Sequence, residues 1–131
     1  MLSDDKIEKL IEALNNKTKK QMINWEETVE RGVYLAALTN SGVRISCRIQ
    51  TDETAGEEFH EHILTVLNGH GMLVDEIKTV DNYKMKELYE NARRMAMNAD
   101  NVIENMLNEL NSLSENKSNL ITKKILEPLE R

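Results

Sequence analysis

The spacing of apolar residues changes twice along the chain, from helical to alternating and back to helical. Four apolar residues near the N-terminus recur at intervals of three and four: Ile7, Leu10, Ile11 and Leu14. This spacing predicts an amphipathic helix. The hydroxyl of Ser3, followed by two acidic residues, suits the start of that helix, and Asn15–Asn16 is expected to end it.

Alternation of apolar and polar residues dominates from residue 22 to about residue 78 and predicts an antiparallel meander of four to five strands. In the clearest segment, Val43–Gln50, four residues are expected to face the core: Val43, Ile45, Cys47 and Ile49. The alternate residues, which include Arg44 and Arg48, are expected to face outward. The other predicted strands are Met22–Thr28, Gly32–Thr39, Phe59–Leu67 and Met72–Ile77.

Two tight turns and one acidic loop separate these strands. The loop is Thr51–Glu57. In the turn Asn40–Ser41–Gly42 the glycine is expected to supply a positive φ. The segment Asn68–Gly69–His70–Gly71 predicts the second turn.

Helical spacing returns after Lys78 and predicts two helices that join near Met97–Asp100. Asp81 or Thr79 is expected to cap the first helix and Asp100 the second. The first has an apolar face made of Met85, Leu88, Ala92, Met95 and Ala99. The second has an apolar stripe made of Val102, Ile103, Met106, Leu107 and Leu110. Beyond the polar segment Asn111–Ser118, Leu120–Leu126 predicts a further short amphipathic helix.

These patterns together predict one α+β domain over residues 1–131, with the sheet at about 22–78 and a C-terminal helical part at about 82–127. The N-terminal helix and the C-terminal helices are expected to pack on the sheet. The C-terminal helices have more apolar surface than one small sheet can cover. A homodimer or a higher homo-oligomer is therefore expected.

Composition narrows the possible classes of partner and the compartment. The net charge of −6 argues against binding to nucleic acid polymers and to anionic membranes, since both need an excess of Lys and Arg. The single cysteine cannot form an intramolecular disulfide, which favours a reducing compartment. The acidic start resembles no signal peptide, and no apolar run is long enough to span a membrane. A cytoplasmic protein is expected.

No catalytic motif is recognisable in the sequence. The G-x-S-x-G, P-loop and G-x-G-x-x-G patterns are missing, and Cys47 falls on the expected core face of its strand. We therefore predict a protein that is not an enzyme, has no catalytic residues and uses no cofactor. His60 and His62 share one strand face, with His70 in the next turn. They are expected to be surface histidines, with a metal site as the alternative.

The arginines are few and are grouped in pairs. Arg44 and Arg48 share one face of one strand, and Arg93 and Arg94 are adjacent on a helix. Guanidinium groups bind phosphate in a bidentate manner and stack on flat rings, so two such groups could hold a phosphorylated ligand. The alternative is that they form ion pairs with the many glutamates, for example Glu90 with Arg94.

Three segments resemble a family of small bacterial and phage proteins: INWEET, NGHG and LYENARRMAMNADNVIENML. The chain also resembles the phage-encoded Thoeris anti-defence sponge proteins. Those proteins are small α+β homo-oligomers that sequester cyclic nucleotide immune signals without cleaving them. The resemblance implies phosphate contacts from Arg93 and Arg94 and from either Arg44 or Arg48. It also implies a base-stacking ring at Phe59 and a ligand-binding amide at Asn68.

The resemblance thus predicts a non-catalytic protein that sequesters a cyclic or phosphorylated adenine nucleotide, in the host cytoplasm if it is phage-encoded. No metal is implied by this function. The alternative is an oligomeric protein-interaction module or inhibitor that binds a partner helix through its C-terminal segment, Leu107–Leu126.

Overall fold

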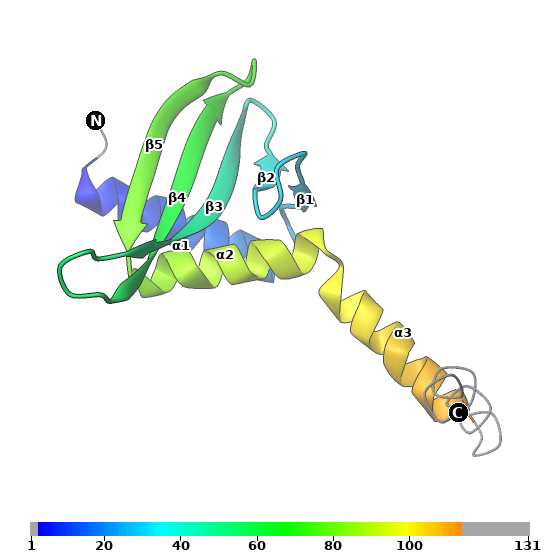
Figure 1. The fold of residues 1–131 in the computed structure, drawn as a ribbon. Coiled ribbons are helices and arrows are strands. Elements are labelled where there is room, and N and C mark those ends of the chain that lie inside the picture. Colours follow the sequence, from blue (N-terminus) through cyan, green and yellow to red (C-terminus); the bar gives the residue numbers. More distant parts are fainter. Residues whose placement is uncertain (1–2, 114–131) are drawn as a thin grey trace. The chain divides into compact units, whose positions relative to one another are not determined.

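The computed structural model describes residues 3–113, and the chain divides into two compact units, Met1–Asn98 and Ala99–Arg131. The first unit consists of α1 (Asp4–Lys19), β1 (Trp25–Glu27), β2 (Tyr34–Ala37), β3 (Ser41–Thr51), β4 (Glu58–Asn68), β5 (Leu73–Val80) and α2 (Tyr83–Ala96), as Figure 1 shows. The second unit contributes α3 (Ala99–Ser112). The predicted α+β class is confirmed.

The five strands form one antiparallel sheet in the order β1-β2-β3-β4-β5, so each strand pairs with its neighbour in sequence. The predicted meander is therefore confirmed, with five strands. The longest pair, β3 and β4, runs in register from Ser41 opposite Asn68 to Thr51 opposite Glu58. The turn Asn68–Gly71 is confirmed, with Gly71 at φ 78° and its N–H donating to the Asn68 carbonyl over 3.0 Å.

The predicted role of Gly42 is wrong. The residue lies inside β3 opposite Ala37, and the positive-φ glycines of residues 3–113 are Gly32, Gly56 and Gly71. The turn is instead closed by the Leu38 N–H, which donates to the Ser41 carbonyl over 2.8 Å. A Cβ on Gly42 would lie 3.3 Å from the Ala36 carbonyl oxygen, so close approach of the backbone explains the glycine.

Helix α1 continues past its predicted end because two of its polar residues make tertiary contacts. The Asn15 side chain donates to the Lys84 carbonyl over 3.0 Å. The Thr18 hydroxyl accepts from the Trp25 indole over 2.9 Å and donates to the Leu14 carbonyl over 2.6 Å. Lys84 lies on α2 and Trp25 lies on β1, so the sequence alone could not reveal these two contacts.

One face of the sheet packs against α2 to form the core. Helix α2 contacts β1, β2, β3 and β4, and α1 packs against α2. The fully buried residues include Ile45 and Leu64 from the sheet and Met85, Leu88 and Ala92 from α2. We call this side of the sheet the helix-covered face, and the other side the opposite face.

The start of α2 differs from the prediction. Its N-cap is Asn82, whose side-chain oxygen accepts from the Met85 N–H over 3.0 Å, and not Asp81 or Thr79. Asp81 has φ 49°, a left-handed conformation that lies outside the helix. The end of α2 near Met97 agrees with the predicted junction.

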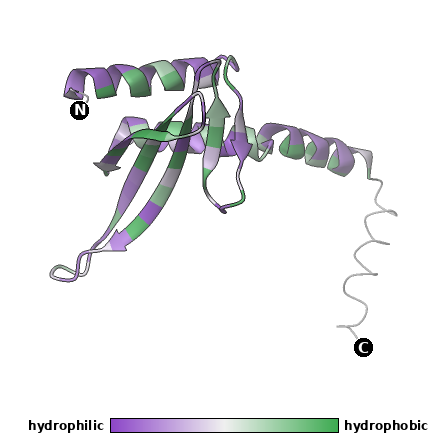
Figure 2. Ribbon diagram, turned by 90° about the horizontal axis from the view of Figure 1, so that it is seen from above, coloured by the Kyte–Doolittle hydropathy of each residue, from purple (hydrophilic) through white to green (hydrophobic). Residues whose placement is uncertain are grey.

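Helix α3 begins at Ala99, so Asp100 lies in its first turn and is not the cap that the sequence predicted. The predicted stripe is present as five exposed residues: Val102, Ile103, Met106, Leu107 and Leu110. Figure 2 shows hydrophobic and hydrophilic residues side by side along this helix. The predicted helix Leu120–Leu126 lies outside the described residues.

None of the helices in the described part of the chain is both long and apolar enough to cross a membrane.

Candidate functional site

The two sheet arginines and the predicted stacking ring lie on the opposite face of the sheet. In the register of β3 and β4, Arg48 pairs with Glu61 and Gln50 pairs with Phe59. Arg44, further along β3, pairs with Thr65 on the same face. The guanidinium of Arg48 is 3.0 Å from the Glu61 carboxylate. For Arg48, the predicted alternative of an ion pair is therefore confirmed.

The other predicted residues lie elsewhere. Arg93 and Arg94 are near the end of α2, and the Arg93 guanidinium is 3.1 Å from the Glu90 carboxylate. The Asn68 side chain accepts from the N–H groups of His70 (2.9 Å) and Met72 (3.0 Å), which stabilises the turn. Since α2 packs on the helix-covered face, the sheet separates its arginines from Arg44 and Arg48. A single pocket for all six predicted residues does not form within one chain.

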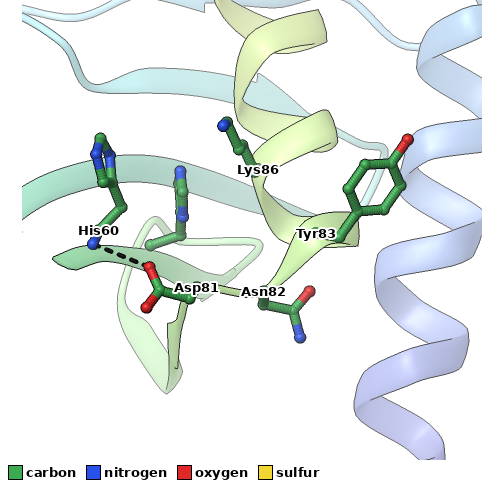
Figure 3. A pocket seen from close by; sticks show the side chains of 6 residues that line it. His60, Asp81, Asn82, Tyr83 and Lys86 are labelled. Atoms are coloured by element: carbon green, nitrogen blue, oxygen red, sulfur yellow. Dashed lines mark hydrogen bonds between the residues drawn. The ribbon is translucent and has the colours of Figure 1, made fainter.

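A pocket of about 250 Å³ lies where β4 meets the start of α2 (Figure 3). It is lined by His60, His62, Asp81, Asn82, Tyr83 and Lys86. We call it the α2 N-terminal pocket. In Figure 3 the Lys86 side chain extends from α2 towards the side of the His60 ring, and the Tyr83 ring projects in the other direction.

Backbone contacts between His60 and Asp81 fix one wall of the pocket. The Asp81 N–H donates to the His60 carbonyl over 3.0 Å, and the Asp81 carboxylate accepts from the His60 N–H over 3.3 Å. Asp81 holds this position in a left-handed conformation, with φ 49°. Residues in such sparsely populated conformations cluster at functional sites, which makes this wall a reasonable place for ligand contacts.

His62 forms the buried part of the pocket. It is only 2% exposed, its ring centroid is 5.6 Å from that of Tyr89, and its Nδ1 has no hydrogen-bond partner among residues 3–113. Buried polar atoms normally have a partner, so the unpaired state of this nitrogen is unusual. Burial lowers the pKa of His62, and the nearby His60 and Lys86 lower it further.

The lowered pKa of His62 predicts that stability falls on acidification. An exposed imidazole has a pKa of about 6.5. Between that value and the lower pKa of folded His62, the unfolded chain binds a proton that the folded chain does not. The neutral His62 ring therefore makes its full contribution to the free energy of unfolding above a pH of about 6.5, and this contribution is lost progressively below that pH.

Urea unfolding on both sides of that pH measures this effect. His62→Phe is expected to reduce the pH dependence of the unfolding midpoint, whereas the control His70→Ala, at an exposed turn residue, is expected to leave it unchanged. Equal pH dependence in the wild type and His62→Phe would contradict the assignment.

Cys47 lies beside this pocket on the helix-covered face and is only partly buried. Its sulfur is 4.0 Å from His60 Nδ1. Burial raises the pKa of the Cys47 thiol, and Glu90 raises it further. A raised pKa favours the thiol over the nucleophilic thiolate, so this Cys–His pair is not arranged as an activated nucleophile.

The three histidines do not converge. His60 and His62 share a face, as predicted, but it is the helix-covered face and not the polar surface that the sequence suggested. His70 lies in the turn beyond the far end of β4, about 30 Å along the strand from His60. Within residues 3–113, no group of three or more His, Cys, Asp or Glu side chains could hold a metal ion.

Sequence reasoning missed most of the pocket residues. Four of them lie just after the last strand: Asp81, Asn82, Tyr83 and Lys86. The sequence pattern predicts a role for Asp81 alone, as a helix cap. The two signals that could have found them are the H-x-H pattern on β4 and an Asn at a strand-to-helix junction. The sequence does not show that these two segments meet.

The fold and the pocket define an α+β protein with a small cavity at a helix N-terminus. Comparisons with protein-family models, with curated proteins and with solved structures found no match.

Proposed function

We propose that this protein binds a small phosphorylated ligand without turning it over, and that the ligand is a cyclic adenine nucleotide immune signal. The α2 N-terminal pocket is the single observation that carries the proposal. The resemblance to the phage anti-defence sponge proteins supports the choice of nucleotide. The pocket takes the place of the predicted arginine site.

The electrostatics of the pocket suit a phosphate. Lys86 supplies an ammonium group, and His60 supplies an exposed imidazole on the same side. The first N–H groups of a helix lack intrahelical partners and attract anions, and here that helix starts at Tyr83. These groups together supply one phosphate with positive charge and with hydrogen-bond donors.

The remaining residues suit a nucleoside. Tyr83 is 78% exposed and its ring projects away from Lys86, so it offers a flat surface for a base that lies outside the pocket. The Asp81 carboxylate can accept hydrogen bonds from an amino group or from ribose hydroxyls. The volume of about 250 Å³ is below the usual range of roughly 300–1,000 Å³ for whole ligands, so part of the nucleotide would remain outside.

Binding without turnover agrees with the state of the nearby side chains. The pKa shifts keep Cys47 as a thiol and His62 as a neutral ring at neutral pH. Neither group is charged or activated as a nucleophile. Tight retention of an intact ligand is the expected behaviour.

Release of bound ligand tests the proposal. The protein is purified from cells that make cyclic nucleotide signals, denatured by heat, and the supernatant is analysed by mass spectrometry. An intact phosphorylated adenine compound is the expected product. A hydrolysed nucleotide would indicate an enzyme, and a supernatant free of nucleotide would contradict the proposal.

A second candidate function is binding of a partner helix by α3. Five apolar residues on one stripe of this helix are each about half exposed: Val102, Ile103, Met106, Leu107 and Leu110. Such stripes usually bind another apolar surface. The same purification separates the two candidates, since this function predicts a stoichiometric protein partner in place of a nucleotide.

A further inference from the structure

Strand β5 is an edge strand, and no strand within residues 3–113 pairs with its outer side. It is the last strand in the sheet order and the outermost strand in Figure 1, on the side away from β1. It has eight residues, whereas the other edge strand, β1, has three. Short edges resist pairing with other chains, but a long edge is a template for another strand.

The hydrogen bonds to β4 show which backbone groups of β5 face outward. Asp81 donates its N–H to His60, and one register continues from Val80 back to Asp75, so Asp75, Ile77 and Thr79 direct their backbone groups to β4. The register shifts beyond Asp75, between Val66 and Leu67 of β4. The backbone groups of Glu76, Lys78 and Val80 therefore point away from the sheet. In agreement, the Glu76 N–H bonds to the Asp75 side chain over 2.8 Å and not to β4.

These outward residues are complementary to themselves in one antiparallel register. In this register the Ile77 residues of the two copies lie opposite each other on a two-fold axis. Glu76 then pairs with the partner's Lys78, and Lys78 pairs with the partner's Glu76. Val74 then lies opposite the partner's Val80, at the point where the β4–β5 register shifts. The outward backbone groups of Glu76 and Lys78 face each other, as an antiparallel ladder requires.

The neighbouring registers are unfavourable. A shift by two residues in one direction places Glu76 opposite the partner's Glu76. A shift in the other direction places Lys78 opposite the partner's Lys78. Like charges directly opposite each other destabilise a strand pair, so charge selects the first register.

The exposed side chains of β5 agree with this pairing. Val74 is 60% exposed and Val80 is 54% exposed, and each would gain an apolar neighbour. Within one chain Glu76 and Lys78 form a 3.4 Å ion pair along the strand, which pairing would exchange for contacts across the axis. The Asp75 carboxylate would have to release the Glu76 N–H.

We propose that two copies of this protein associate through β5 and form one continuous antiparallel sheet across a two-fold axis. The interface is isologous, because the same strand contributes both halves. None of the β5 residues named above lines the α2 N-terminal pocket or belongs to α3, so the proposal rests on neither candidate function.

Sedimentation equilibrium of the full chain tests this interface. The wild type is expected to dimerise. Lys78→Glu is expected to weaken the dimer by at least about tenfold, since it places two glutamates opposite each other on both sides of the axis. The double variant Glu76→Lys, Lys78→Glu restores opposite charges and is expected to recover dimerisation.

A backbone variant provides an independent check. Lys78→Pro removes an N–H that points away from β4, so the sheet within one chain keeps its ladder while pairing between copies is blocked. Circular dichroism verifies that each variant is folded. A wild type that stays monomeric, or a dimer that withstands both Lys78→Glu and Lys78→Pro, would overturn the proposal.

Discussion

Replacing Trp25 with alanine is expected to lower the free energy of unfolding by about 3–5 kcal/mol. Trp25 is 1% exposed, and its indole donates to Thr18 on α1 over 2.9 Å. Its backbone N–H contacts the Met95 sulfur of α2 at 3.4 Å. The residue thus joins the edge strand β1 to both helices of the first unit, and its loss leaves a large cavity where three elements meet.

Domains of this size are stable by only about 5–15 kcal/mol, so the variant is expected to be partly unfolded or close to it. Urea unfolding followed by circular dichroism measures the effect, because the variant has no tryptophan left for fluorescence. Val29→Ala, at a fully exposed side chain, is the control and should change stability by less than about 0.5 kcal/mol. A small effect of Trp25→Ala would show that the core forms without this anchor.

Reversing the charge of Lys86 is expected to weaken nucleotide binding by about 10- to 100-fold. A hydrogen bond to a charged group contributes about 1.5–3 kcal/mol, and each 1.4 kcal/mol corresponds to about a factor of ten. Lys86→Glu removes such a bond and adds a negative charge near the carboxylate of Asp81, which also lines the pocket. Repulsion of a phosphate adds to the loss.

Isothermal titration with the nucleotide released by heating measures this change, with cyclic AMP as a first probe. Lys6→Glu is the matched control, since it makes the same charge change at an exposed residue of α1 that does not line the pocket. Equal affinity in the two variants would remove Lys86 from the site. Loss of binding in both would point to overall charge and not to this pocket.

The apolar pattern was sufficient to predict the elements but not all of their ends. The meander, α1 and α2 follow from periods of two and of three to four residues, and the Asn68–Gly71 turn follows from its residue types. The end of α1 was placed too early, because Asn15 and Thr18 are polar in sequence but buried by contacts with α2 and β1.

The candidate site could not be predicted in the same way. Alternation separates the two faces of a strand, but it does not say which face a helix covers when both faces mix apolar and polar residues. In β4 the helix-covered face carries His60 and His62, and the opposite face carries Ile63 and Leu67. A sequence pattern contains no information on the sheet that lies between Arg44 and Arg93, so it predicts one arginine site.

The α+β class, the antiparallel strand order and the shared face of His60 and His62 can be predicted from the sequence, because they depend on local spacing and short connections. Three features required the folded structure: α2 covers this face, His62 is buried near Lys86, and Arg44 and Arg93 lie on different sides of the sheet. These features depend on packing between distant segments, where shape and burial outweigh local preference.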